Sequence, residues 1–478
     1  MEKDTPLDRL SDAIFPLFIE ALRRLAAMPA DARSMDVEAE VSQEVVQAEA
    51  SAYARALEAM DEELCACLPE GTRVHDARSR TIATRVGDVT FRRRRCIDRA
   101  GNLDIPLDSL LELPPNARMS PEFESEIVWL AAGGSCQRAA DVAAFTGSSR
   151  ITRNAVMGCM RRAGRACEKD DARRERSLWK DGVLPGGGLH ADELCVESDG
   201  TVVSLQHADG RRHAEIKAMV AYAGKERHGK KVRRIHTVSF GCTGTPDRMW
   251  RQGIAAAASV YDLSAVGTVH SGFDGASWCS GGLEWLRDIA SSAKGHLDPF
   301  HVNRIVSFCF GREHEEERLE AMELVYEGDA EGCASLLERM AQEGAAKPEQ
   351  AHAAARYLRN HAGSIGVPGP SLGTMEAENQ HVYKSRMASV PCAWSEQGAS
   401  DMARIRSRQA SGRPIPHLSP EERRSARRRD RRKRKEESIL PSGPAASCAV
   451  ASEGRGYEYP VRGSVEAMGA EVRYRSGC

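Results

Sequence analysis

The chain has 478 residues, of which 41% are hydrophobic and 28% charged, a composition typical of a soluble protein with roughly two to four domains. Its 67 basic and 69 acidic residues give a net charge of -2, which does not by itself indicate a nucleic-acid partner. The 14 cysteines form no Cys-x-x-Cys pair, and no apolar run approaches the roughly 20 residues that span a bilayer. We therefore expect reduced thiols in the cytoplasm, no structural zinc site, no secretory leader and no membrane partner.

The charge is unevenly distributed along the chain. Acidic residues concentrate at 36–70, whereas 92–95, 153–165 and 423–435 are rich in Arg and Lys. A basic block can hold phosphates by releasing counterions, without reading base sequence. We expect residues 418–478 to form a flexible basic tail that contacts DNA. The predicted contacts are Arg428, Arg429, Arg431 and Arg432.

The first two segments are expected to be structural. Residues 7–68 carry apolar side chains at three- and four-residue steps, which predicts a packing or self-association helix within a region spanning 1–75. Residues 76–118 alternate in polarity around Gly87-Asp88, which predicts a β-hairpin with a two-residue turn there. Residues 92–95 are all Arg, and they favour equally a charge-protected edge strand and a phosphate contact.

Residues 119–168 carry the start signals of three short helices. Ser120-Pro121-Glu122 combines a capping hydroxyl with proline at the first helical position, a second helix follows Ser135, and a third starts at Thr152 and ends near Gly164. Short helices with a Gly-containing turn before a basic third helix are typical of a helix-turn-helix, although a plain helical bundle has the same spacing. The residues that we expect to face DNA are Arg150, Arg153, Asn154, Arg161 and Arg162.

Residues 186–410 change to an α/β pattern. Extended segments at 189–196, 202–206, 216–222 and 235–240 predict an antiparallel meander, and helix, strand and helix then follow at 247–260, 265–269 and 276–290. This order is the plan of an RNase H-like domain. The predicted fold class is therefore α/β: an RNase H-like catalytic domain preceded by a mostly helical N-terminal region.

Several acidic residues of this domain stand at element ends. Asp192 opens the first strand, Asp274-Gly275 lies at a strand-to-helix turn, and Asp298 and His301 flank a helix start, where capping is the alternative to a metal-ligand role. Glu376 and Glu378 follow a charged helical stretch, about 200° apart around a helix, so that both cannot face one site.

Taken together and in order, these motifs resemble the ISLre-type insertion-sequence transposases, relatives of the mutator-like DDE transposases. The resemblance rests on Ala191-Asp192-Glu193, residues 274–278, residues 297–301, and Glu376 near Ser385-Arg386-Met387 and Trp394-Ser395, within about 75–410. It implies that Asp192, Asp274 and Glu376 form the metal-binding catalytic triad. It also implies that Asp298 and His301 match the superfamily's Asp-x-x-His, that residues 303–360 are a helical insertion, and that Glu376 rather than Glu378 is the third ligand.

Three converging carboxylates repel one another unless cations lie between them. Oxygen ligands suit Mg²⁺ or Mn²⁺, and two such ions about 3.5–4 Å apart would activate a water or a 3′ hydroxyl for in-line displacement. The resemblance therefore implies a nucleoid-associated bacterial transposase that binds terminal inverted repeats and target DNA. Synapsis of two ends favours a homodimer or a higher oligomer.

Two other functions fit the same pattern. An RNase H-like domain also hosts structure-selective nucleases and resolvases, which hydrolyse DNA without joining it. A transposon-derived DNA-binding protein without catalytic activity is the second alternative.

Overall fold

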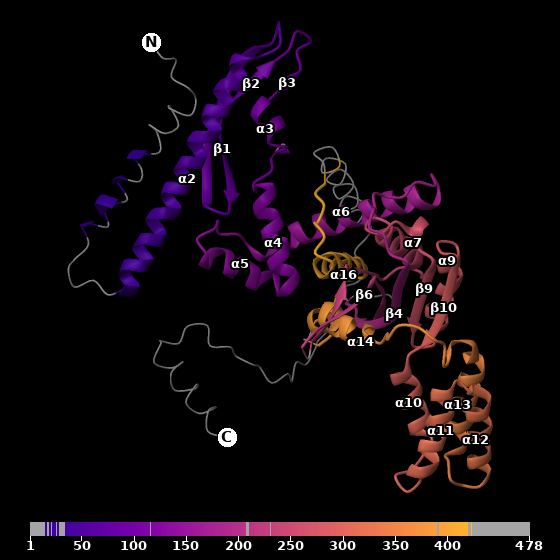
Figure 1. Cartoon of the computed structure of the whole chain (residues 1–478). Coiled ribbons are helices and arrows are strands. Elements are labelled where there is room, and N and C mark those ends of the chain that lie inside the picture. Colours follow the sequence, from indigo (N-terminus) through magenta and orange to yellow (C-terminus); the bar gives the residue numbers. More distant parts are fainter. Residues whose placement is uncertain are drawn as a thin grey trace, which may run out of the picture. The chain divides into compact units, whose positions relative to one another are not determined.

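The structure, a computed structural model, describes residues 15–16, 19–20, 22–24, 26–27, 34–114, 116–206, 210–229, 231–389, 392–418 and 422 (Figure 1). The predicted DNA contacts Arg428, Arg429, Arg431 and Arg432 lie outside these residues. The described part is a mixed α/β structure whose main sheet has both parallel and antiparallel strands. None of its helices has the length and apolar character required to cross a membrane.

The first described elements form a helix packed on a hairpin. Helix α2 (Ser34–Ala66) lies along β2 (Gly87–Ile97), which pairs with β1 (Arg73–Thr84), and Leu57 of the helix is buried in the small core between them. The predicted apolar stripe is only partly correct. Ala48 and Leu57 are buried, whereas Val45, Tyr53 and Met60 are partly exposed.

The hairpin is present, but its turn was predicted two residues too late. Thr84 pairs with Gly87, so the turn consists of residues 85 and 86. Three of the four consecutive arginines on β2 are ion-paired within the protein, to Asp108, Asp61 and Asp76 respectively. Most of the arginine charge on this strand is therefore neutralised within the protein and is not available to an outside partner. The two short elements that follow are β3 (Leu103–Asp104) and α3 (Pro106–Leu110).

Three helices then follow from the predicted start signals. They are α4 (Pro121–Gly133), α5 (Cys136–Phe145) and α6 (Arg153–Trp179). Each is capped by a hydroxyl, since Ser120, Ser135 and Thr152 accept hydrogen bonds from backbone N–H groups three residues later.

Helix α6 differs from the prediction in length. It does not end near Gly164 but continues to Trp179, so the expected domain boundary at 168 falls inside a continuous helix. The extension is held by ion pairs: Asp170 and Asp171, both buried, contact Arg408 at 2.9 and 2.6 Å. Because these partners are more than 200 residues away along the chain, no local pattern indicates them.

The main sheet has five strands in the order β10, β9, β4, β5, β8. Strand β5 is antiparallel to both of its neighbours, whereas β4, β9 and β10 run parallel. An antiparallel meander followed by alternating helix and strand is thus present, but the predicted segments 189–196 and 202–206 form one strand. The strands of the sheet are β4 (Glu193–Ser204), β5 (His213–Tyr222), β8 (Val238–Cys242), β9 (Thr268–Phe273) and β10 (Ser292–Leu297).

Short elements connect these strands. The two-stranded sheet between β5 and β8 consists of β6 (Gly224–His228) and β7 (Lys231–Ile235). The helical connections are α7 (Pro246–Ala257), the 3-10 turn η1 (Leu263–Ala265), α8 (Ser277–Ser280) and α9 (Gly282–Arg287). Helix α7 packs on β8 and β5, and its Trp250 is fully buried.

A helical insertion follows β10, close to the predicted range 303–360. Figure 1 shows its four helices gathered into a bundle, and they enclose a hydrophobic core of their own, which Phe273 of β9 joins to the sheet. The helices are α10 (Pro299–Phe308), α11 (Glu315–Glu327), α12 (Ala330–Gln342) and α13 (Pro348–Asn360), with the 3-10 turn η2 (Ala362–Ser364) at the end.

The chain then returns to the sheet. The returning elements are α14 (Met375–Glu378), a π-helical turn η3 (Asn379–Lys384), α15 (Ser385–Met387) and α16 (Glu396–Ala410). Helix α16 packs on both α6 and β8. Its Met402 and Ile405 join Phe123 of α4 and Ile216 of β5 in one hydrophobic core. The three predicted DNA-binding helices therefore share a core with the sheet.

Candidate active site

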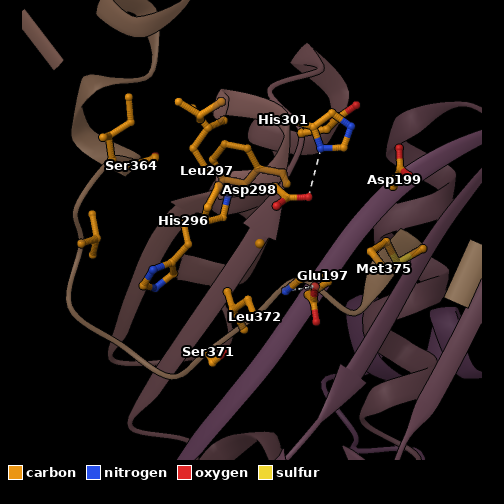
Figure 2. Close-up of a pocket in the computed structure, with 18 of the residues that line it drawn as sticks. Glu197, Asp199, His296, Leu297, Asp298, His301, Ser364, Ser371, Leu372 and Met375 are labelled. Carbon is orange, nitrogen blue, oxygen red and sulfur yellow. Dashed lines mark hydrogen bonds and ion pairs between the residues drawn. The ribbon is translucent and has the colours of Figure 1, made fainter. Parts of the chain in front are cut away.

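A pocket of about 280 Å³ lies at the carboxyl ends of the parallel strands. Its walls are residues 197–199 of β4, the ends of β9 and β10, the start of α10, and the segment 364–376 that returns from the insertion. The carboxyl edge of parallel strands is where open α/β sheets commonly bind ligands. Figure 2 shows Asp199 on β4 across the pocket from Asp298 and His301.

Asp199 and Asp274 meet at this edge. The parallel register pairs Ser198 with Phe273, which places the two aspartates on neighbouring strands, one residue further along each. Burial raises the pKa of Asp199, and the nearby Asp274 carboxylate raises it further against a hydrogen bond from the Gly200 N–H. The side-chain amide of Asn379 donates to the second Asp199 oxygen at 2.6 Å. The pocket therefore holds two carboxylates in mutual repulsion.

The Asp274 side chain is oriented by its own turn. Its Oδ1 accepts the Ala276 N–H at 2.9 Å, and the Tyr357 hydroxyl donates to its carbonyl oxygen at 2.7 Å. Gly275 has φ of +90°, and a Cβ there would lie only 2.6 Å from the Tyr357 ring. A side chain at 275 is thus excluded by both backbone conformation and space, and the turn is fixed against the insertion.

Asp298 and His301 form a pair on the first turn of α10. Asp298 caps the helix by accepting the Phe300 N–H at 2.9 Å, and its other oxygen contacts His301 Nδ1 at 3.0 Å. Hydrogen bonding to Asp298 raises the pKa of His301. Burial raises the pKa of Asp298, but its bonds to His301 and the Phe300 N–H outweigh this effect and lower the pKa overall. The capping alternative is confirmed, and His301 is also placed in the pocket wall.

The structure separates the two glutamates of α14. Glu376 lines the pocket, its side chain is 59% exposed, and its carboxylate contacts Lys384 at 3.0 Å. Glu378 is buried on the other side, ion-paired with Arg234 and hydrogen-bonded by Ser239. Of the two, only Glu376 can reach a ligand in the pocket, in agreement with the preference from the sequence.

A buried carboxylate that the sequence did not single out fixes the segment carrying Glu376. Glu197 accepts hydrogen bonds from the backbone N–H groups of Gly373 and Thr374, each at 2.7 Å, and from the hydroxyls of Tyr222 and Thr374. Glu197 and Asp199 lie two residues apart on β4 and so share one face of the sheet. Glu197 therefore holds residues 373–374 over the sheet beside Asp199.

The structure does not bring Asp192 into this pocket. Asp192 precedes β4, at the end of the strand opposite to Asp199, and seven residues at about 3.3 Å each separate the two by about 23 Å. Its side chain is 91% exposed and contacts His190, while its carbonyl oxygen accepts N–H groups at the start of β9. The structure therefore does not bring Asp192 together with Asp274 and Glu376, whereas Asp199 lines the same pocket as those two residues.

Asp199 was missed because the strand was divided in two. The sequence interpretation ended one extended segment at Val196 and began the next at Val202, whereas β4 runs unbroken through Asp199-Gly200. Asp-Gly is usually a turn signal. Here the ladder to β5 runs through both residues, pairing Asp199 with Ala218 and Gly200 with Lys217, and keeps the dipeptide extended.

The predicted DNA contacts on α6 and in the loop that precedes it differ in availability. Arg150, Arg153, Asn154 and Arg161 are exposed. Arg162 is half-buried and ion-paired with the buried Glu124 at 2.7 Å, so its charge is already neutralised within the protein. Arg162 is accordingly removed from the predicted contact surface.

Among the described residues, no group of three or more His, Cys, Asp or Glu side chains is already arranged to hold a metal ion. The donors that line the pocket nevertheless suit a hard cation, because Asp199, Asp274 and Glu376 supply only oxygen. Mutual repulsion of Asp199 and Asp274 is the condition that a divalent cation relieves. Glu376 would have to leave Lys384 to join them.

The fold and pocket define an α/β protein with an acidic site at the carboxyl edge of a mixed sheet. The chain belongs to the uncharacterised protein family UPF0236, whose model matches residues 33–424. It is similar to the UPF0236 protein in the vanSb 3' region of Streptococcus gallolyticus, with 26% identity over 58% of this chain and 59% of that protein. The chain thus spans less than two thirds of the length of that relative.

Two proteins of Caldanaerobacter subterraneus subsp. tengcongensis are also similar. One is 22% identical over 73% of this chain and 74% of its own length. The other is 23% identical over 73% of both chains, and its printed name joins eleven designations.

Proposed function

We propose that this chain is a DNA transposase with an RNase H-like domain, which cleaves and joins DNA strands at Asp199, Asp274 and Glu376 with two Mg²⁺ or Mn²⁺ ions. Asp199 replaces Asp192 in the triad that the sequence resemblance implied. The observation that carries the proposal is the meeting of Asp199 and Asp274 on adjacent parallel strands, with their charges in mutual repulsion inside a pocket.

The topology supports the proposal. Three antiparallel strands followed by two parallel ones, in the spatial order β8, β5, β4, β9, β10, correspond to the strand plan of RNase H-like domains. That fold hosts several phosphoryl-transfer activities, so the topology favours a reaction class and not one enzyme. The transposase assignment also draws on the ordered motifs from residue 274 to residue 399.

The name of one relative adds separate support. Eleven designations joined in one protein name take the form expected when a single sequence is encoded at several places in a genome. A mobile element that copies itself would produce such a pattern. We therefore favour a transposase over a resident nuclease.

The polar residues in and around the pocket have distinct roles in the proposed reaction. Asp199, Asp274 and Glu376 would hold the cations, which when bound supply activation of a water or 3′ hydroxyl and charge neutralisation at the scissile phosphate. Asn379 orients Asp199, the turn at Gly275 orients Asp274, and Glu197 positions the segment of Glu376. The Asp298–His301 pair places in the wall a histidine whose pKa is raised by Asp298, and the protonated form of this histidine would face a phosphate.

We further propose that the helices α4, α5 and α6 bind the element ends through Arg150, Arg153, Asn154 and Arg161, and that the protein acts as a homodimer or higher oligomer on two ends. Exposure of these four side chains around the start of α6 supports a DNA contact. Nothing in this assignment requires the ion-paired Arg162.

The test compares three Asp→Asn variants of the full chain on DNA carrying the element ends, with Mg²⁺ present. We expect Asp199→Asn and Asp274→Asn to lose strand cleavage by at least about a hundredfold, because each removes a charge that the cations require. Asp192→Asn, directly before the same strand, is the matched control and should cleave as the wild type does. Full activity of Asp199→Asn together with loss in Asp192→Asn would refute the revised triad. Hydrolysed products without joined strands would indicate a nuclease, and binding without cleavage would indicate an inactive DNA-binding protein.

A further inference from the structure

We infer that the hairpin of β6 and β7, with the groove at its base, binds the phosphate backbone of the DNA strand that enters the candidate active site. The inference rests on the proposed function and deepens it, because it states where the substrate strand is held.

The hairpin is strongly basic. Its described residues include five Lys or Arg side chains and a single carboxylate, that of Glu226. The cations are Lys225, Arg227, Lys231, Arg233 and Arg234. In the antiparallel register Glu226 stands opposite Arg233, and Lys225 stands opposite Arg234, whose charge Glu378 neutralises. The hairpin therefore keeps an excess of positive charge, which favours a role in binding an anion.

Two of these cations attach the hairpin to the segment that carries Glu376. The Lys225 ammonium donates to the Leu372 carbonyl at 3.3 Å, and the Arg234 guanidinium contacts Thr374 Oγ1 at 3.4 Å and also the buried Glu378. The ion pair with Glu378 neutralises the charge of Arg234. These bonds also fix the base of the hairpin beside the active-site pocket.

The other three cations of the hairpin form no ion pair with the described part of the protein. Arg227, Lys231 and Arg233 are exposed, and within the described ranges no carboxylate is within ion-pair distance of them. Glu226, the one acid of the hairpin, is paired with His228 at 3.3 Å. Three positive charges thus remain for an outside anion.

The groove at the base of the hairpin leads toward the catalytic residues. It has a volume of about 1,130 Å³ and is lined by side chains of both hairpin strands and of α16. Ser371 lines this groove and the active-site pocket alike, and Thr374 faces the groove while its neighbours Gly373 and Met375 face the pocket. A chain of phosphates that crosses residues 371–376 would therefore contact both sites.

The lining also indicates which part of DNA is held. The groove residues in the described part of the chain include no Phe, Tyr or Trp on which bases could stack. They offer cations and polar groups, which suit phosphate oxygens, and the two carboxylates among them, Glu226 and Glu378, contact His228 and Arg234 respectively. We therefore expect binding that is independent of base sequence and strongly dependent on salt.

The experiment removes the three free charges from the full chain. The variant Arg227→Ala/Lys231→Ala/Arg233→Ala is compared with Arg176→Ala/Arg287→Ala/Arg312→Ala, which removes three exposed charges that line neither cavity. Affinity for a labelled duplex of arbitrary sequence, and for its single strand, is measured over a range of salt concentrations. We expect the slope of log affinity against log salt to fall by roughly 2 to 3 in the hairpin variant and to stay at the wild-type value in the control. Equal slopes in the two variants would overturn the inference.

The outcome can be told apart from failure of the proposed function. A salt slope that falls in the hairpin variant, with no strand cleavage by the wild type, would keep the phosphate site and reject the transposase. Cleavage that depends on Asp274, with equal binding by both triple variants, would keep the transposase and reject the phosphate site. Binding of DNA by none of the proteins would reject both and favour an acidic protein partner for the hairpin.

Discussion

At Glu197, one buried carboxylate accepts four hydrogen bonds from groups that lie far from it in the sequence. A carboxylate can do this because each of its two oxygens can accept more than one hydrogen bond. The bonds determine where residues 373–376 lie on the sheet. The position of Glu376 therefore depends on a side chain that has no predicted contact with the substrate.

The first prediction follows for Glu197→Gln. The amide keeps one acceptor oxygen for the N–H groups of Gly373 and Thr374, but its NH₂ group replaces the oxygen that accepts from the Tyr222 and Thr374 hydroxyls, so those two hydrogen bonds are lost or must reverse. We expect the free energy of unfolding to fall by about 1–3 kcal/mol and strand cleavage to slow, because Glu376 is displaced. Urea denaturation and a cleavage assay measure the two effects.

Glu193→Gln is the matched control for this variant, since Glu193 is exposed on the same strand. It should leave both quantities near the wild-type values. If the two variants are equally stable and equally active, the role assigned to Glu197 is incorrect.

At the scale of elements, local chemistry predicted where helices begin but not how far they extend. Ser120, Ser135 and Thr152 cap their helices as expected, because a hydroxyl cap depends only on the next three residues. The length of α6 depends on Arg404 and Arg408 of α16, which neutralise Asp170 and Asp171 across more than 200 residues of sequence. The unbroken course of β4 likewise depends on its neighbours.

The same limits apply to the candidate site. Asp274, Asp298, His301 and Glu376 stand beside element ends that the sequence marks, and the structure places all four around one pocket. Asp199 stands inside a strand, where only the ladder with β9 reveals its neighbour.

The second prediction concerns the packing of α6 on α16, and it compares alanine substitutions at two glycines of α6. A Cβ at Gly164 would lie 2.3 Å from the Asp401 side chain, whereas a Cβ at Gly158 would meet only the end of the Arg162 side chain at 3.3 Å. Glycine inside a helix normally costs about 0.5–1 kcal/mol relative to alanine. We expect Gly164→Ala to lower the free energy of unfolding by about 1–3 kcal/mol, because the overpacking exceeds that gain.

Gly158→Ala is the matched control on the same helix, and we do not expect it to lower the free energy of unfolding. It should be neutral or stabilising, because the flexible guanidinium of Arg162 can move aside. Thermal unfolding of both variants measures the effect. Stabilisation by alanine at both positions would contradict the close contact between α6 and α16.

At the scale of the molecule, helices α4, α5 and α6 share one hydrophobic core with the sheet and α16. Phe123 and Ile127 of α4 are buried with Ile216 and Val220 of β5 and with Ile405 of α16. These helices and the sheet accordingly belong to one compact unit. The boundary that the sequence suggested between 168 and 186 is therefore not a point where the core divides.

The third prediction is that α4 and β5 unfold together. Amide hydrogen exchange under native conditions should give the same opening free energy for Ile127 and Val220, because neither side chain can leave the shared core without exposing the other. The insertion has a core of its own, and its amides serve as the internal comparison. A lower opening free energy for α4 alone would show that the helices form a separable module.

Closure of this core by α16 has a consequence for how the protein is made. Chains emerge from the ribosome with the N-terminus first, and among the described elements α16 is the last helix that packs on α6 and β8. Until it emerges, Asp170 and Asp171 lack Arg404 and Arg408, and one side of β8 lacks its cover. Nascent or prematurely terminated chains without α16 would therefore contain Asp199, Asp274 and Glu376 but lack the finished scaffold that aligns them.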